Sequence, residues 1–246
     1  MAGRYRRAVR IAAAIHRIGD NPIVNAYLIE EVGEVTVVDA GMPGLFAALP
    51  TELARMGRSL ADVRALVLTH GHPDHIGFAE RLRQERGVPV SIHEYDAALA
   101  RGEVPNSVKR SGPLRVAPVL RFLWYGLRND GVRRPIVGEV ATFGDGATLD
   151  VPGNPRVILV PGHTPGSASL HLAELDALFV GDALCTYAVT SGRRGPRLSP
   201  FNADAEQAIA SLARLEGIPA QLVLPGHGEP WTEGIDEAVR LATRAA

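Results

Sequence analysis

Short runs of β-branched and other apolar residues recur along the chain, and each is followed at once by a glycine-containing turn that carries histidine or aspartate. The runs fall at residues 35–38, 65–69, 156–160, 178–180 and 222–224. Apolar runs of this length are typical of buried strands, and glycine lets the backbone turn sharply where a strand ends. If these strands lie side by side, their ends place the polar side chains along one rim of the sheets, on loops held by a rigid scaffold.

Three stretches repeat apolar residues at helical spacing, at 75–86, 203–215 and 234–244. The first stops at Gly87, and the second follows Asn202, which we expect to cap it. Strands outnumber helices, and the helices fall between groups of strands. The pattern therefore predicts an α+β fold with layers in the order α–β–β–α.

The length of the chain allows one domain with a sizeable core. We expect a single domain over all 246 residues. Within it, the strands and polar turns fall into two halves, at about 1–125 and 130–246. We expect each half to supply side chains to one shared site.

Composition and charge narrow the class of protein. Hydrophobic residues make up 46% of the chain and charged residues 22%, which is ordinary for a globular protein in water. The formal net charge of −1 provides no overall field that would draw the chain to nucleic acid or acidic lipid, so we expect neither nucleic acid nor membrane as a partner. Cys185 is the only cysteine, so no disulfide within the chain is possible, which fits a cytoplasmic protein. The apolar stretch at 11–15 is shorter than the apolar region of a signal peptide, so we do not expect one there.

Side chains able to bind a metal are most closely spaced in residues 70–75, which read His-Gly-His-Pro-Asp-His. Neutral imidazoles and a carboxylate suit zinc, and also iron, manganese or cobalt. His70 and His72 project to the same side of an extended backbone, whereas Asp74 and His75 follow one turn later and face a second point nearby. Because one ion with three protein ligands would use only part of this cluster, the motif predicts two ions side by side.

With this motif the sequence resembles the metallo-β-lactamase superfamily, and more closely its glyoxalase II-like and lactonase-like hydrolases. The HxHxDH signature of that family stands at residues 70–75, its PGHTPGS segment at 161–167, its GDAL segment at 181–184 and its late GHG at 226–228. The order and approximate spacing of these segments agree from about residue 15 to residue 235. The resemblance implies the αββα sandwich known as the metallo-β-lactamase fold, and a metal-dependent hydrolase that acts on a small molecule.

Carried over residue by residue, the resemblance implies a site with two divalent metal ions. We expect zinc, with iron or manganese as alternatives. The first ion would be held by His70, His72 and His163. The second would be held by Asp74, His75 and His227, and Asp182 would bridge the two. Asp39 has no place on either ion in this scheme and is expected to hydrogen-bond a ligand histidine or the backbone of the motif.

The segment 101–135 is the part least like the family. It contains eight basic residues against two acidic ones, and residues 120–125 are rich in aromatic side chains. We expect a partly helical lid between the halves, in which Trp124 contributes to an apolar wall of the site. A solvated connector whose aromatic residues pack on the sandwich is the alternative. Tyr187 is a second candidate for substrate contact, because lactone-cleaving relatives carry a tyrosine near the bridging aspartate.

Three functions compete for such a site. The first is hydrolysis of a small ester, thioester or lactone by a hydroxide that bridges both ions, with Asp74 as the catalytic residue that orients the hydroxide and receives its proton. The second is oxidation at a single non-haem iron, as in persulfide dioxygenases, which are similar to the same branch. The third is phosphodiester cleavage, as in RNA-processing relatives, which the neutral overall charge disfavours. We therefore predict the first.

Overall fold

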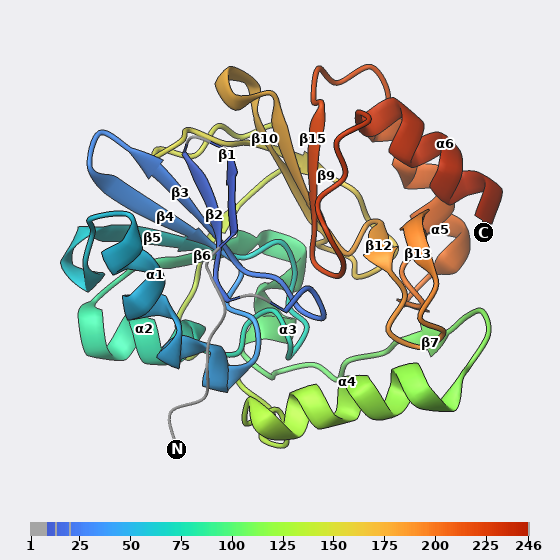
Figure 1. Ribbon diagram of the computed structural model, residues 1–246, viewed down its shortest axis with the longest axis horizontal. Helices are drawn as coiled ribbons and strands as arrows, with labels where there is room; N and C mark the ends of the chain where they lie inside the picture. The colour runs from blue at the N-terminus through green and yellow to red at the C-terminus, as the bar shows by residue number, and fades with distance from the viewer. Residues whose placement is uncertain (1–8, 13, 20, 246) are drawn as a thin grey trace.

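A computed structural model describes residues 9–12, 14–19 and 21–245 of the chain. Within these residues, two large β-sheets face each other and helices cover the outer face of each sheet (Figure 1). The layers follow the order helix, sheet, sheet, helix, so the predicted α+β sandwich is confirmed. Residue 13, within the apolar stretch at 11–15 discussed above, and residues 1–8 lie outside the described residues. No helix in the described part is both long and apolar enough to cross a bilayer.

The first sheet contains seven strands of the described chain, in the spatial order β1-β2-β3-β4-β5-β6-β8. In that order the strands span Val9–Ala12, Ile15–Arg17, Tyr27–Glu31, Glu34–Val38, Val63–Val67, Val90–His93 and Ala141–Phe143. Strands β1 to β4 pair antiparallel, whereas β4, β5, β6 and β8 run parallel. The last strand, β8, joins this sheet from beyond residue 130.

The second sheet has the order β15-β11-β10-β9 within the described residues. In that order its strands span Leu222–Pro225, Ala177–Gly181, Ala168–Leu172 and Arg156–Leu159. Because β10 is antiparallel to both β9 and β11, and β15 is parallel to β11, the strands β9, β11 and β15 all point the same way. Two short pairs lie outside the sheets: β12 (Cys185–Tyr187) with β13 (Arg194–Arg197), and β7 (Lys109–Arg110) with β14 (Phe201–Asn202).

Successive residues of the central strands face opposite sides of their sheet, and this alternation builds the core. In β5, Val67 packs between the sheets, whereas Leu66 packs against the helices α1 (Leu49–Arg55) and α2 (Ala79–Arg86). In β11, Phe179 packs between the sheets, whereas Leu178 packs toward α6 (Ile235–Ala245) on the opposite outer face. The apolar runs therefore form strands as predicted; β4, β5, β11 and β15 are largely buried, whereas β9, at the edge of the second sheet, is only partly buried.

The helices differ from their predicted ranges mainly at their starts. Helix α2 begins four residues after the predicted start at His75, because residues 75–78 form the turns that close the metal motif. It ends as predicted at Gly87, which is left-handed at φ 68°. The predicted cap at Asn202 is wrong. Asn202 lies in β14, and α5 (Ala205–Ser211) is capped by Asp204, whose carboxylate accepts a hydrogen bond from the N–H of Gln207.

The carboxyl ends of β4, β5 and β6 in one sheet, and of β9, β11 and β15 in the other, meet at one edge of the sandwich. A further helix, α4 (Val116–Arg128), runs across this edge at the bottom of Figure 1. At its start, the N–H of Arg115 donates to the carbonyl of Thr190, and at its end the N–H of Gly44 donates to the carbonyl of Asn129, both at 2.9 Å. The helix is thereby tied to both parts of the sandwich, one at each end.

Candidate metal centre

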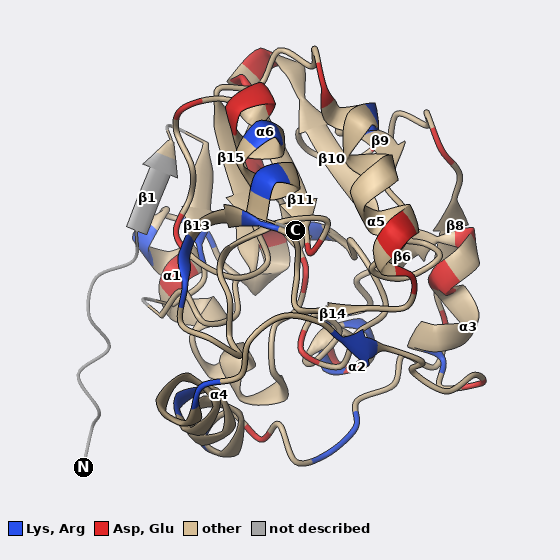
Figure 2. Ribbon diagram, turned by 90° about the vertical axis from the view of Figure 1, so that its right-hand side faces the viewer, with Lys and Arg blue, Asp and Glu red and all other residues tan. Residues whose placement is uncertain are grey.

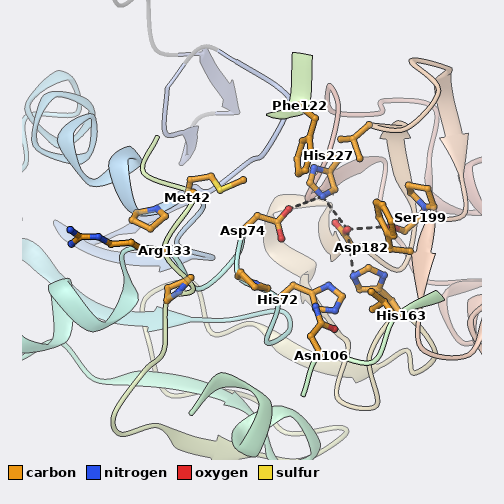
Figure 3. Close-up of a pocket in the computed structure, with 18 residues that line it drawn as sticks. Met42, His72, Asp74, Asn106, Phe122, Arg133, His163, Asp182, Ser199 and His227 are labelled. Carbon is orange, nitrogen blue, oxygen red and sulfur yellow. Dashed lines mark hydrogen bonds and ion pairs between the residues drawn. The ribbon is translucent and has the colours of Figure 1, made fainter. Parts of the chain in front are cut away.

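The seven predicted ligands come together at this edge, and each lies on a loop that directly follows a strand. The loop after β5 carries residues 70–75, and the loops after β9, β11 and β15 carry His163, Asp182 and His227. Figure 3 shows members of this set from both sheets facing the same cavity. Close approach of the loops requires glycine. A Cβ atom on Gly226 would lie 2.3 Å from Oδ1 of Asp182 and 2.5 Å from Cε1 of His75.

One cluster of donor atoms contains three buried imidazoles. Nitrogen atoms of His70, His72 and His163 lie within 4.8 Å of one another. Two of them, Nε2 of His70 and Nε2 of His163, are only 3.2 Å apart. An arrangement that turns several imidazole nitrogens toward one point is that of a metal site with histidine ligands.

A second cluster lies beside the first. Donor atoms of Asp74, His75 and His227 also fall within 4.8 Å of one another. Nε2 of His227 lies 3.5 Å from Oδ2 of Asp74, and Nε2 of His75 lies 4.0 Å from the same oxygen. The two histidines are buried, whereas the side chain of Asp74 keeps 19% of its surface exposed. This cluster therefore opens toward solvent through its carboxylate.

Asp182 lies between the two clusters. Its Oδ2 is 3.5 Å from Nε2 of His163 in the first cluster and 3.2 Å from Nε2 of His227 in the second. Its Oδ1 is 3.6 Å from Nε2 of His75. The dashed lines in Figure 3 mark its contacts with His163 and His227. One carboxylate is thus within reach of both groups of donors.

The outer nitrogens of three of these histidines are engaged away from the centre. Nδ1 of His75 lies 2.9 Å from Oδ2 of Asp39, and Nδ1 of His227 donates to the carbonyl of Ile23. The hydroxyl of Thr69 contacts both Asp39 and Nδ1 of His70. Because a carboxylate only accepts, this hydroxyl donates to Asp39 and accepts from Nδ1 of His70. Each of these Nδ1 atoms then carries a proton, so Nε2 is the nitrogen that each ring offers to a metal ion.

Asp39 is held in the strained left-handed region, at φ 58°. Besides its contact with His75, its carboxylate accepts the N–H of Thr69 at 2.8 Å. Asp39 also forms a third set of close donor atoms with His70 and His75. Because Asp39 faces the outer nitrogen of His75, we assign it to orientation of the ring rather than to a metal.

Burial and the neighbouring charges set the protonation of the cluster. Burial lowers the pKa of His163 to about 3 and also lowers the pKa of His70 and of His72. Burial also acts to lower the pKa of His75, but nearby carboxylates, first of all Asp182, outweigh it and raise the pKa to about 10. Burial acts to raise the pKa of Asp182, but His227 and the other histidines hold it well below its usual value. An ionised carboxylate surrounded by imidazoles is a donor set that attracts a divalent cation.

Several of these atoms have no hydrogen-bond partner within the described structure although they are buried. They are Nε2 of His72, Nε2 of His75 and Oδ1 of Asp182. An unpaired buried polar atom costs about 1–3 kcal/mol, so three of them in one place require a ligand to offset that cost. The mixture of imidazole nitrogen and carboxylate oxygen fits zinc, iron or manganese. The residues present therefore fit a divalent metal centre.

Asp96 supports the site and was missed by the sequence analysis. It is fully buried, and its carboxylate accepts the N–H of Gly71 at 2.8 Å, the N–H of Gly166 at 2.7 Å and the hydroxyl of Thr164 at 2.7 Å. These donors flank His70, His72 and His163. Asp96 thus joins the motif loop of one sheet to the His163 loop of the other. The available signal was its position soon after the apolar run at 90–93, where the other polar residues of the site also follow strands.

A cavity of about 320 Å³ opens beside the donor atoms. Its floor includes His72, Asp74, His163, Asp182 and His227. Apolar side chains form much of its wall: Met42, Val108, Phe122, Val189 and Phe201. Asn106, Arg133 and Ser199 add polar groups. Because residues 106, 108, 122 and 133 belong to the segment 101–135, this segment covers the site, as a lid would.

The two residues predicted to contact substrate lie elsewhere. Trp124 is 59% exposed on the outer face of α4, and Phe122 is the aromatic residue of this helix that faces the cavity (Figure 3). Helical geometry explains the difference, because positions two apart point to different sides. Tyr187 lines a neighbouring cleft of about 160 Å³ with Arg121 and Arg194. Cys185 is buried in β12, where burial raises the pKa of its thiol, so it is packed rather than reactive.

Comparison with known proteins agrees with this architecture. The sequence profile of the metallo-beta-lactamase superfamily matches residues 19–227. The chain is 28% identical over 229 residues to a probable metallo-hydrolase of Bacillus subtilis, YflN, covering 85% of this chain and 82% of that protein. It is 29% identical over 179 residues to the hydroxyacylglutathione hydrolase GloC of Haemophilus influenzae, covering 70% and 72% of the two chains.

Solved structures show the same fold. The metallo-beta-lactamase family protein TTHA1429 of Thermus thermophilus superposes with a TM-score of 0.68 at 27% identity, covering 95% of this chain and 79% of that one. The Rm3 metallo-beta-lactamase superposes with a TM-score of 0.69, at 18% identity. The histidine and aspartate clusters lie within the matched residues. The named relatives support a metal-dependent hydrolase activity, and this chain belongs to the metallo-beta-lactamase superfamily.

Proposed function

We propose that the protein hydrolyses a small carbonyl substrate, namely an ester, a thioester or a lactone, with two divalent metal ions, preferably zinc. The observation that carries the proposal is the position of Asp182, whose carboxylate reaches histidines of both donor clusters at 3.2 to 3.6 Å. A single ion would bind only one of the two donor clusters, whereas two ions would use both. The relative named as a hydroxyacylglutathione hydrolase adds support for an acyl substrate.

Each residue of the site has a distinct part in this proposal. The first ion would be held by His70, His72 and His163, and the second by Asp74, His75 and His227, with Asp182 shared between them. When bound, such ions lower the pKa of water and polarise a carbonyl group. Asp39 and Thr69 fix the tautomer and direction of the ligand rings.

Asp74 is the residue proposed to act on the reacting water. It is the partly exposed carboxylate of the set, and it lines the cavity. From there it can orient a water molecule and accept its proton, which is the part of a general base. The apolar wall around Phe122 and Val189 would hold the acyl portion of the substrate and exclude bulk water.

The test begins with the metal. Protein expressed without metal supplementation is analysed for zinc, iron and manganese, and is then assayed on nitrophenyl esters, thioesters and lactones. We expect close to two ions per chain and turnover of at least one of these classes. A single iron with oxygen uptake on a persulfide would overturn the proposal in favour of the dioxygenase. Turnover that survives complete removal of metal would overturn it as well.

A further inference from the structure

Helix α4 has two apolar faces, and the described structure covers only one of them. Its inner residues, including Phe122 and Tyr125, pack with Ile23, Val24 and Met42 beside the cavity. Its outer face carries a continuous apolar stripe at three- and four-residue spacing. The stripe consists of Val116, Leu120, Leu123, Trp124 and Leu127, which are 55% to 71% exposed. Single exposed apolar residues are ordinary, but five on one helix face form a surface that marks an interaction site.

The surroundings of this stripe are strongly basic. Residues 101–135 contain eight basic and two acidic residues, a net charge of +6 in a chain whose formal net charge is −1. Arg101 is paired with Glu103. The other seven are exposed, and none forms an ion pair within the described part of the chain: Lys109, Arg110, Arg115, Arg121, Arg128, Arg133 and Arg134. Figure 2 shows basic residues on α4 and on the chain beside it.

We infer that the outer face of α4 docks on the surface of an anionic lipid bilayer. Helix α4 lies along the edge of the molecule (Figure 1). Its exposed tryptophan and leucines, together with its exposed arginines, fit the headgroup region of a membrane. The apolar side chains would enter the boundary of the acyl chains while the guanidinium groups meet the lipid phosphates. The net charge of the whole chain gives no sign of this, because the basic residues of one segment are offset by acidic residues elsewhere.

Charge also decides between a bilayer and a second copy of this chain. Two copies that paired along their α4 helices would bring Arg115, Arg121 and Arg128 of each toward the same residues of the other. Asp130 is the one acidic residue of the segment that is not already paired with Arg101. Like charges would therefore oppose the pairing, whereas an anionic surface complements them. This inference does not depend on the proposed hydrolysis.

The test measures binding of the full chain to vesicles by sedimentation. One set of vesicles is phosphatidylcholine, and the other is phosphatidylcholine with an equal amount of phosphatidylglycerol. We expect binding to the anionic vesicles, at least tenfold stronger than to the neutral ones, and weaker in high salt. The emission of tryptophan should shift to shorter wavelength on binding. Trp124→Phe should remove this shift, because Trp231 is packed against the core of the second sheet.

Two variants, each with a control, separate the contribution of the apolar side chains to vesicle binding from that of the positive charges. The triple variant Leu120→Gln, Leu123→Gln and Leu127→Gln should bind the anionic vesicles at least tenfold more weakly. Its control is Val32→Gln with Tyr95→Gln, which alters residues exposed elsewhere. Removal of charge by Arg121→Gln with Arg128→Gln should weaken binding by roughly fivefold for each arginine. Its control is Arg86→Gln with Arg244→Gln.

Three results would overturn the inference. The first is no sedimentation with anionic vesicles. The second is an equal loss of binding in the control variants, which would show that the helix has no special part. The third is a dimer in solution that the triple leucine variant converts to a monomer without any vesicle binding, which would assign the face to a second copy of the chain.

Discussion

The loops that hold the metal-site residues bury polar side chains, whereas the segment that covers these loops exposes apolar ones. The loops bury imidazoles and carboxylates, with His70, His75 and Asp182 almost inaccessible to solvent. The segment 101–135 instead exposes leucine and tryptophan on α4. The buried polar groups contact one another and the ligand that they would share, whereas the leucines and Trp124 on α4 remain 55% to 60% exposed, with only the guanidinium of Arg128, among the described residues, placed over the Trp124 ring.

This contrast separates two tasks of the molecule. The loops are fixed by strand ends, by the glycine residues between them and by Asp39 and Asp96, so their geometry serves a reaction. The covering segment is attached to the sandwich at both ends of α4, and its inner side chains shape the cavity. We infer that chemistry is set by the loops, and that substrate size and location are set by the covering segment.

The strongest test of the loops is the carboxylate that lies between the two donor clusters. Asp182→Asn keeps the size of the side chain but removes its charge, so we expect kcat/KM to fall by about a thousandfold or more, equivalent to about 4 kcal/mol. Metal content should fall as well. The matched control is Asp150→Asn at an exposed position, which should leave both unchanged. Retention of full activity and metal in Asp182→Asn would remove Asp182 from the site.

Asp96 tests whether the two loops act as one unit. Asp96→Ala leaves the N–H groups of Gly71 and Gly166 and the hydroxyl of Thr164 without their acceptor. We expect the free energy of unfolding to fall by about 3 kcal/mol, measured by urea denaturation. Glu94→Ala changes an exposed carboxylate of the same turn and should have little effect. If the two variants are equally stable, the three hydrogen bonds do not hold the loops together.

A substitution at Asp39 tests whether its contact with Nδ1 of His75 orients the ring of this predicted ligand. Asp39→Asn retains an oxygen near Thr69, but it no longer offers a charged acceptor to Nδ1 of His75. We expect metal affinity to fall by about 10- to 100-fold, measured by competition with a chromogenic chelator. The loss should be smaller than that of Asp182→Asn, because the donor atoms themselves remain. An affinity equal to that of the unaltered protein would contradict the assignment.

The central strands and the meeting of the polar turns were predictable because their causes are local. Five apolar runs ended in glycine turns, and they form the strands β4, β5, β9, β11 and β15. The ends of these strands bring Asp39, the residues of 70–75 and the later histidines to one edge. The resemblance to a known family then gave the pairing of residues with ions. The structure brings these residues into two clusters, and their roles as ligands remain a proposal.

What escaped prediction depends on contacts between distant parts of the chain. The strands β1, β2 and β3 lie before the first polar turn and lack its signal, and β8 joins the first sheet from residues 141–143. Asn202 looked like a helix cap, but its pairing with Lys109 placed it in a strand. Asp96 carries no motif, and its importance lies in donors that are 25 and 70 residues away. The choice between Phe122 and Trp124 depends on the rotation of α4, which packing decides.

The rotation of α4 about its axis is tested by two substitutions, for which we expect the smallest effects on activity. Phe122 lines the cavity, so Phe122→Ala should raise KM for a bulky acyl substrate by about tenfold, the equivalent of about 1.4 kcal/mol of apolar contact, with kcat little changed. Trp124→Ala is the matched control on the same helix. Its side chain points outward, so KM for a substrate in free solution should stay the same. If Trp124→Ala raises KM as much as Phe122→Ala does, α4 must rotate when substrate binds, and the division between an inner face for substrate and an outer face for a partner fails.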